Sequence, residues 1–539
     1  MISRRQFLLR SAASGAGLAA FSNRAGALEA QKILELAGTR APSSGTYTRM
    51  FPDLPRQGAN NPHLEEGLIE LGENMKNDSN EPPRCKTAPA GYTYLGQFID
   101  HDLTLDILPL HAANPRAEEN PNYRTPCLDL DQLYGGGPTL SPFLYRNKEQ
   151  DRGEERFLIG RTRPTEIGNK DFPCSLDDLP RNAEGVALTG DPRQDENLII
   201  AQLHVAFLRV HNWALDKLRS GELNSAGPEG ATCFEQARRL LTWHYQWIVR
   251  NDYLKKILDP DIYAEITKKD YKPRMRSLQS GFRIPIEFSG AAFRFGHSMV
   301  RNEYRINDTD DAHKNVLLKD VLGLSGARGG ARPNLPADWK IDWNYFVPLR
   351  GEFAAQPSSN IDTEIVSGLY ALSQDTKKLF ATAMPGESDQ CKPTVSKRGE
   401  NDLPVITLLR GARMELPSGQ EVAKALRIKN PLTDVEIVKD SVHKEILTKY
   451  GFHTDTPLWY YVLREAELRG GGCRLGPTGS KIVGDVIITA LLSDQDSYLS
   501  INPDWKPALP TRKNGRESFD ITDLIHFSIN PDWKPIPNR

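Results

Sequence analysis

The stretch Gln97–Asp102 carries an amide, a histidine and two carboxylates within one short segment. In a helix, residues three and four apart share a face, so Gln97, Asp100 and His101 are expected on one side and Asp102 on another. The first side has the acid–base groups of a reaction centre, and Asp102 is suited to hold a cation. On its own, such a short pattern is more often an ordinary helix surface than a catalytic face.

Two further blocks carry histidine, arginine and carboxylate side chains. Residues 190–197 form a turn that leads into an apolar helix, and they include Arg193 and Glu196. In the block 293–297, Arg294 and His297 share a helix face. Helix capping by acidic residues is an ordinary explanation for part of the first block.

The block 125–131 differs, because its polar groups are mainly oxygen ligands. Asp129 and Asp131 alternate with apolar residues, and a threonine hydroxyl and backbone carbonyls lie close by in sequence. This set of hard oxygen donors is typical of a calcium site. A solvated acidic surface is the alternative.

The elements that must position these residues are mainly helical. Apolar residues recur at three- and four-residue spacing in the segments 196–218, 234–257, 291–302, 364–383, 441–450, 458–469 and 480–492. Few runs alternate as strands, and long connections rich in Pro, Gly and Asn cover 106–126, 135–190 and 322–362. The pattern predicts an all-α, mainly helical fold with one large core, long loops and little β structure.

Composition excludes several classes of partner. The 539 residues include 68 Lys and Arg against 70 Asp and Glu, which gives no electrostatic bias toward nucleic acid. Hydrophobic residues make up 39% of the chain, without an uninterrupted apolar run of about 18 residues. We therefore expect no nucleic-acid partner and no stable membrane insertion of the mature protein.

The first residues resemble an export signal. Arg4 and Arg5 precede the mildly apolar stretch Ser11–Phe21, and the small residues Ala25–Ala27 follow. This order is typical of a twin-arginine signal with a cleavage site, whereas a cytosolic basic helix is the alternative. We expect residues 1–27 to be the signal, 28–60 to be an N-terminal leader segment, and the protein to be periplasmic or secreted.

The cysteines give no sign of a metal site. The six cysteines show no metal-binding spacing, so no zinc site is indicated; they are Cys85, Cys127, Cys174, Cys233, Cys391 and Cys473. Their pairing stays open, and single buried thiols are the expected state of most.

The sequence of residues 500–507 recurs at 528–535. We interpret residues 501–539 as a tail with a duplicated, Trp-anchored segment rather than a binding repeat.

In this order, the four blocks resemble those of animal-type haem peroxidases of the peroxidase–cyclooxygenase superfamily, in particular bacterial members. Residues 243–247, 416–420 and 475–477 extend the similarity, which covers about residues 60–500. The resemblance implies a single haem peroxidase domain over 61–500. It also implies an enzyme that reduces hydrogen peroxide through a ferryl intermediate while it oxidises small organic donors or halides.

The resemblance assigns catalytic roles to residues of this chain. His297 matches the proximal ligand of the haem iron, and His101 matches the distal base that moves a proton between the peroxide oxygens. Arg193 matches the distal arginine that stabilises developing charge, and Gln97 matches the glutamine that orders water or halide.

Three residues are assigned to the haem b periphery by the same resemblance. Asp100 and Glu196 match the carboxylates that become ester-linked to haem methyl groups in animal members. Asn197 stands where one mammalian enzyme has a methionine, so a sulfonium link cannot form. Arg294 matches the arginine beside a haem propionate.

The resemblance also completes the calcium shell. It adds Asp102, Thr125 and the carbonyl of Cys127 to Asp129 and Asp131. Such a site would tie the helix of His101 to the loop 125–131, and it would explain an acidic residue directly after the histidine.

One position departs from the family pattern. The family places an asparagine before a segment like Leu408–Gly411, where it accepts the N–H of the proximal histidine. Here Thr407 stands at that position. A threonine oxygen can accept this bond at shorter reach, so the tuning of the iron is expected to differ.

Two other functions remain open at this point. A fatty-acid dioxygenase of the same superfamily needs a tyrosine three residues before the proximal histidine, where this chain has Arg294. An extracellular binding or adhesion module of low activity on the same fold is the second alternative. The electron donor and the oligomeric state are not indicated by the sequence.

Overall fold

Helices make up most of the fold in the computed structural model. It describes residues 45–79, 83–106, 116–146, 155–167, 170–223, 230–277, 281–309, 311–323, 334–349, 355–370, 402–513 and 515–530. The longer helices are α3 (Leu64–Asn74), α4 (Gly91–Leu103), α7 (Leu198–Arg219), α8 (Cys233–Ile248), α14 (Leu403–Arg413), α18 (Leu458–Arg469), α19 (Pro477–Ser493) and α21 (Ile521–Ile529). The shorter ones are α5 (Asp131–Tyr134), α6 (Gly137–Leu140), α9 (Leu254–Ile257), α10 (Pro260–Ile266), α11 (Ile286–Ser289), α12 (Leu318–Gly323), α15 (Gly419–Ala425), α16 (Asp434–Val438), α17 (Lys444–Lys449) and α20 (Tyr498–Ile501).

Strands are few and short. Within the described part of the chain they form five two-stranded sheets: β1 (Gly45–Thr46) with β4 (Pro121–Asn122), β2 (Lys76–Asn77) with β10 (Ile365–Val366), β3 (Arg84–Pro89) with β9 (Pro357–Ser359), β5 (Thr165–Ile167) with β6 (Lys170–Phe172), and β7 (Glu303–Tyr304) with β8 (Val316–Leu317). Only β2 and β10 run parallel. The prediction of a mainly helical fold with little β structure is confirmed.

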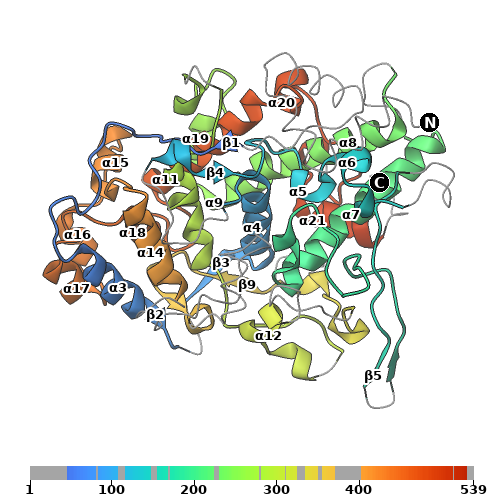
Figure 1. Ribbon diagram of the computed structural model, residues 1–539, viewed down its shortest axis with the longest axis horizontal. Helices are drawn as coiled ribbons and strands as arrows, with labels where there is room; N and C mark the ends of the chain where they lie inside the picture. Colours follow the sequence, from blue (N-terminus) through green and yellow to red (C-terminus); the bar gives the residue numbers. More distant parts are fainter. Residues whose placement is uncertain are drawn as a thin grey trace, which may run out of the picture.

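Helix α4 lies near the middle of the molecule, between two groups of helices. In the view of Figure 1, α3 and α14–α18 lie to its left, and α5–α8 with α21 lie to its right. It contacts α7, the π-helical turn η6 (Val249–Tyr253) and the 3₁₀ segment η8 (Ala292–His297). The blocks that the sequence singled out around His101 and His297 are therefore neighbours in space.

Capping side chains, two of them local and one from a neighbouring helix, explain where three of the main helices begin. Asn197 caps α7 by accepting a hydrogen bond from the backbone N–H of Ile200 at 2.9 Å. Thr232 and Glu235 form a capping box at the start of α8. At the start of α19, the fully buried carboxylate of Glu465 accepts the N–H of Thr478 at 2.8 Å. Each of these groups satisfies backbone donors that a helix start leaves without partners.

Helix α7 is long and apolar enough to cross a membrane by length and composition alone. However, 89% of its most apolar 18-residue stretch is buried inside the protein. It packs against α8 and α21, and its burial is that of a core helix.

Five of the seven predicted helices are confirmed, with shifts of a few residues; the helix 291–302 is wrong, and the helix 364–383 is wrong over the residues that the structure describes. The segment 291–302 forms only the 3₁₀ turn η8, after which the chain extends. In 364–383, the described residues form β10 and a 3₁₀ turn at Ser367–Leu369, and residues 371–383 lie outside the described part. Pairing of Ile365 with Lys76 in β2 overrides the helical pattern there, because tertiary contacts outweigh weak local propensity.

Cys85 of β3 and Cys473, which follows α18, form a disulfide with their Cα atoms 5.1 Å apart. The sequence left this pairing open. Cys127, Cys174 and Cys233 are thiols outside any disulfide, of which Cys174 is exposed and the other two are half-buried. The expectation of single buried thiols is therefore wrong for these three, and Cys391 lies outside the described residues.

The first copy of the C-terminal repeat is anchored by its tryptophan. The ring of Trp505 packs against Trp243 and His244, with centroids 5.4 and 5.0 Å apart. The backbone N–H groups of Ala508 and Leu509 each donate to His244 Nε2 at 3.0 Å. The second copy beyond Asn530 and the predicted export signal lie outside the described residues.

Candidate active site

The two faces of α4 point to different surroundings, as the helical spacing predicts. Gln97, Asp100 and His101 approach the turn 191–197 that precedes α7, whereas Asp102 points to the loop that leads into α5. Asp102 is fully buried, and His101 is 2% exposed. The helix therefore serves one site on each side.

The carboxylate of Glu196 is the centre of the first site. Gln97 Nε2 donates a hydrogen bond to Glu196 Oε1, and His101 Nε2 lies 3.5 Å from the same oxygen. Asn197 Nδ2 donates to Gln97 Oε1 at 3.2 Å. Distant parts of the sequence thus place an imidazole, a carboxylate and two amides in one cluster.

Arg193 is held rigidly beside this cluster. Its Nε and Nη2 donate to the two carboxylate oxygens of Asp191 at 3.1 and 2.8 Å, and Nη2 also donates to the carbonyl of His101 at 3.2 Å. Burial works against the charge of Arg193, but Asp191 outweighs it and raises the pKa. Its remaining nitrogen, Nη1, lies 3.9 Å from Asp100 Oδ2. The site therefore keeps a permanent cation on the side of Asp100.

The second ring nitrogen of His101 has a partner that the sequence analysis missed. Gln194 Nε2 lies 3.2 Å from His101 Nδ1, and both side chains are buried. Asp191, the partner of Arg193, was missed as well. Its position two residues before Arg193 in a turn was the only signal available for it, and Gln194 offered none.

His297 lies across from this cluster on η8, which contacts α4. Burial, followed by the nearby cation Arg294, lowers the pKa of His297 to about 3, so the ring is neutral. Its Nδ1 is buried and has no hydrogen-bond partner among the described residues. A Cβ on the adjacent Gly296 would meet only open space. A neutral imidazole with space beside it would suit a protein ligand of a metal cofactor.

The expected hydrogen bond between Thr407 and His297 is not formed. The Thr407 hydroxyl donates instead to the carbonyl of Leu403 at 2.8 Å, one turn back in α14. This bond is the usual choice of a threonine inside a helix, since its short side chain reaches its own backbone first. His297 Nδ1 has no partner among the described residues, so Thr407 does not accept its N–H here, and a role of Thr407 beside a bound cofactor stays a prediction.

Arg294 and Asp100, which lie on the segments of His297 and His101, are close enough to interact electrostatically. Arg294 Nε donates to the carbonyl of Ser289 at 2.8 Å. Burial and the neighbouring cation Arg410 lower the pKa of Arg294, an arrangement that favours an anionic ligand. Asp100 is 37% exposed at its side chain, and its Oδ1 accepts a hydrogen bond from the Thr104 hydroxyl at 3.0 Å.

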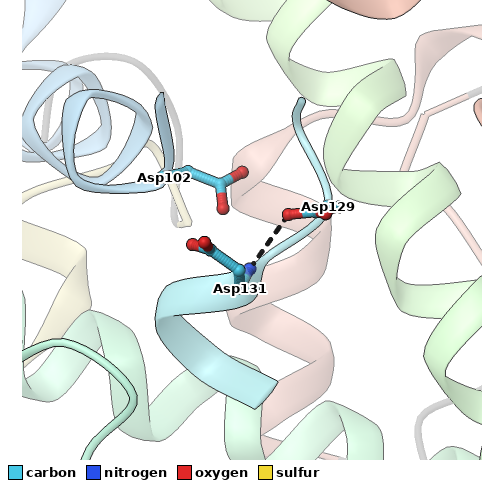
Figure 2. Close-up of side chains that lie close together, drawn as sticks. All are labelled: Asp102, Asp129 and Asp131. Carbon is cyan, nitrogen blue, oxygen red and sulfur yellow. Dashed lines mark hydrogen bonds between the residues drawn. The ribbon is translucent and has the colours of Figure 1, made fainter. Parts of the chain in front are cut away.

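On the opposite face of α4, Asp102 lies close to Asp129 of the following loop and to Asp131 at the start of α5 (Figure 2). Ligand oxygens of Asp102, Asp129 and Asp131 all lie within 4.8 Å of one another. Both oxygens of Asp102 are buried, and neither accepts a hydrogen bond of good geometry from the described residues, although the Leu130 backbone and the Tyr245 hydroxyl lie close enough to lower its pKa. Burial, and then the charges of Asp129 and Asp131, raise the pKa of Asp102 well above its usual range. Burial also raises the pKa of Asp131 to about 7, although Arg124 opposes this shift.

The loop around these carboxylates is ordered by hydrogen bonds. The Thr125 hydroxyl donates to Asp129 Oδ1 at 2.9 Å, and the N–H of Asp131 donates to the same oxygen at 3.2 Å. Arg124 Nη1 donates to Asp131 Oδ1 at 3.0 Å. The donor set consists of hard oxygens with excess negative charge, and it fits a divalent cation such as calcium. Cys127 lies in this loop, and the role of its carbonyl stays a prediction.

These features define a helical protein with two histidines on neighbouring segments and an acid–base cluster suited to a bound cofactor. The chain belongs to the animal haem peroxidase family, whose model matches residues 106–495. The match begins just after Asp102 and includes Arg193, Glu196 and His297.

Named relatives agree with this assignment. Peroxidasin homolog pxn-2 of Caenorhabditis elegans is 25% identical over 72% of this chain and 32% of its own length. Thyroid peroxidase of Mus musculus is 26% identical over 70% of this chain and 38% of its own length. The chain therefore spans about a third of the length of these curated relatives.

Solved structures share the fold. Peroxidase A of Dictyostelium discoideum superposes with a TM-score of 0.55 at 16% identity and covers 92% of this chain and 95% of its own. A fatty acid α-dioxygenase of Oryza sativa gives 0.57 at 12% identity, over 91% of this chain and 80% of its own. At these identities the likeness concerns the fold alone.

Proposed function

We propose that this protein is a haem peroxidase that reduces hydrogen peroxide while it oxidises small organic donors or halides. The observation that carries the proposal is the convergence of Gln97, His101, Arg193 and Glu196 on one face of α4, next to the segment of His297. Membership of the animal haem peroxidase family supports it.

The haem would be held by His297, and when bound it supplies the redox chemistry that side chains lack. His101 Nε2 is placed to take a proton from one oxygen of hydrogen peroxide and to return it to the other. Arg193, kept in place by Asp191, stabilises negative charge as the O–O bond breaks. Gln97, held by Asn197 and Glu196, orients water or peroxide beside His101.

Asp100 and Glu196 are the proposed sites of ester links to the haem, and Arg294 is the proposed propionate partner. The support is their position at the edge of the same face as His101. If either ester forms, acidified organic solvent will leave haem on the protein after peroxide treatment. Complete extraction would exclude both links.

Calcium is the second proposed cofactor, bound by Asp102, Asp129 and Asp131 with Thr125 and the Cys127 carbonyl. Two buried carboxylates and a half-buried one in one cluster, with Asp102 oxygens that accept no hydrogen bond of good geometry, support it. Bound calcium would neutralise this charge and join α4 to the loop before α5.

The decisive experiment is a visible spectrum of the purified protein before and after peroxide, followed by guaiacol oxidation. A Soret band and peroxide-dependent turnover are expected. His297→Ala should lose the haem, whereas Arg193→Ala should keep it and react slowly with peroxide. A protein without haem would favour a binding module, and oxygen uptake with linoleate would favour a dioxygenase. Arg294 at the position of the required tyrosine argues against the dioxygenase.

We also propose export by the twin-arginine route to the periplasm or beyond. The motif with Arg4 and Arg5 supports this proposal. Replacement of both arginines by lysine should leave the protein in the cytoplasm of a bacterial host. Export of this variant at the normal level would refute it.

A further inference from the structure

Gln194 occupies a position that no role of the proposed peroxidase site yet explains. Its side chain is fully buried, and its amide lies 3.2 Å from His101 Nδ1. The other ring nitrogen, Nε2, faces Glu196 Oε1 at 3.5 Å, on the side where peroxide would bind. Gln194 therefore contacts the nitrogen of His101 that turns away from the reaction.

The turn that carries Gln194 is clamped on both sides. Before it, Asp191 accepts the backbone N–H of Arg193 at 2.8 Å and pairs with the Arg193 side chain. After it, Asp195 pairs with Arg181 through two hydrogen bonds of 2.7 and 2.9 Å. These ion pairs fix the 3₁₀ turn η5 (Pro192–Asp195), so the Gln194 amide is presented to the imidazole with little freedom to move away.

The proton of a neutral imidazole sits on one ring nitrogen, and the hydrogen bond at the other nitrogen decides which. If the amide N–H of Gln194 donates to Nδ1, the proton lies on Nε2 and points at Glu196. If the amide oxygen accepts from Nδ1–H, Nε2 carries a lone pair. Only the second arrangement lets Nε2 take a proton from peroxide. An amide can turn to present either atom, since its oxygen and nitrogen are nearly equal in size.

We propose that Gln194 is the positioning residue of the distal base: its amide oxygen accepts the Nδ1–H of His101 and so keeps the lone pair on Nε2. The inference rests on the proposed peroxidase function. A glutamine suits this role better than a carboxylate does, because it orients the ring without adding charge. A carboxylate at this point would stabilise the imidazolium and make His101 slow to return its proton.

Other charged and titratable groups surround His101. Glu196 faces Nε2, Asp191 and Arg193 come from the same turn as Gln194, His204 approaches from α7, and Asp100 and Asp102 flank it on α4. Burial lowers the pKa of His204 to about 3, so this neighbour is neutral over the working range. Each of these groups stays in place when Gln194 alone is changed, so their contribution is common to all variants.

The test compares Gln194→Met, Gln194→Glu and the wild type by stopped-flow reaction of the haem-loaded protein with peroxide across pH. Gln194→Met keeps the volume but loses the acceptor, and we expect the rate to fall by about 10- to 100-fold. Gln194→Glu keeps an acceptor for Nδ1–H. Its rate should recover at high pH, with the acidic limb of the profile shifted upward by about one unit or more.

A matched control is Gln132→Met. Gln132 is another fully buried glutamine whose amide donates to α4, at the carbonyl of Phe98, and it does not contact His101. Its replacement should leave the rate and its pH profile unchanged. If Gln194→Glu is as slow as Gln194→Met at every pH, Gln194 acts only through packing and the inference is overturned.

A second readout does not depend on turnover. In ¹⁵N-histidine-labelled protein, reduced and bound to carbon monoxide, the His101 signals are identified by their loss in His101→Ala. We expect a protonated Nδ1 in the wild type and a mixture of both forms in Gln194→Met. Identical signals in the two proteins would overturn the inference. A wild type that binds haem but does not react with peroxide would refute the proposed function, while the signals still test the role of Gln194.

Discussion

Replacement of Asp102 by asparagine should have opposite effects with and without calcium. The three carboxylates of the cluster have ligand oxygens within 4.8 Å of one another. At an effective dielectric constant of about 20, each ionised pair at this distance repels by about 3.5 kcal/mol. Asp102 faces two such partners, so its charge costs up to about 7 kcal/mol when no cation is present. Protonation of Asp102 relieves part of this cost. Without a bound cation, Asp102→Asn is therefore expected to stabilise the folded protein by about 2–4 kcal/mol.

Bound calcium reverses the effect of Asp102→Asn on stability, because the Asp102 charge then faces a divalent cation. Calcium at about 100 times its dissociation constant stabilises the folded protein by about 2.7 kcal/mol, and loss of a buried ligand removes most of this. Asp102→Asn should therefore melt below the wild type in excess calcium and above it in a chelator. Thermal unfolding of the wild type and of Asp102→Asn, each in calcium and in chelator, gives the four melting temperatures.

Glu465→Gln provides the control for this experiment. Glu465 is also a fully buried carboxylate, but it caps α19 and lies outside the cluster. Its effect on the melting temperature should be the same in calcium and in chelator. If Asp102→Asn likewise shows one sign and one size under both conditions, the three carboxylates do not bind a cation.

Three further predictions concern other parts of the molecule. His101→Ala should retain the Soret band but react with peroxide about 100-fold or more slowly, and a normal stopped-flow rate would exclude His101 as the base. Burial raises the pKa of Asp362 to about 8, so the folded protein holds a proton that the unfolded chain releases from about pH 4 upward. The folded protein therefore loses stability as the pH rises from about 4 to about 8. Asp362→Asn carries no ionisable group at this position, so it should raise the melting temperature above pH 8 and leave it unchanged below pH 4. Reduction of the Cys85–Cys473 disulfide, which closes a loop of 388 residues, should lower the melting temperature, and Cys85→Ser should show the lower value with or without reductant.

Several features of the fold were predictable because they depend on local periodicity. The helices around Leu198–Arg219 and Leu458–Arg469 carry strong apolar stripes and bury them, so propensity and packing agree. Where local propensity and tertiary packing favour different secondary structures, packing determines which one forms. Ile365 lies in a helix-like pattern, yet it joins a strand because Lys76 offers a free backbone edge there.

The two faces of α4 followed from the sequence alone. The spacing of Gln97, His101 and Asp102 fixes their directions on any helix, whatever surrounds it. The family motifs added Arg193 and His297 as partners, and the structure brings both segments to α4. Residue type and spacing therefore determined which groups take part.

Only the tertiary structure decided how these groups are held. The contact of Gln194 with His101 and the pairing of Arg193 with Asp191 depend on a short turn whose path no periodic pattern describes. Thr407 shows the same limit, since its hydroxyl binds its own helix rather than His297. Helical spacing is a property of the backbone and can be read from the sequence. The partner of a buried polar atom depends on which segments meet, and the folded chain alone determines that.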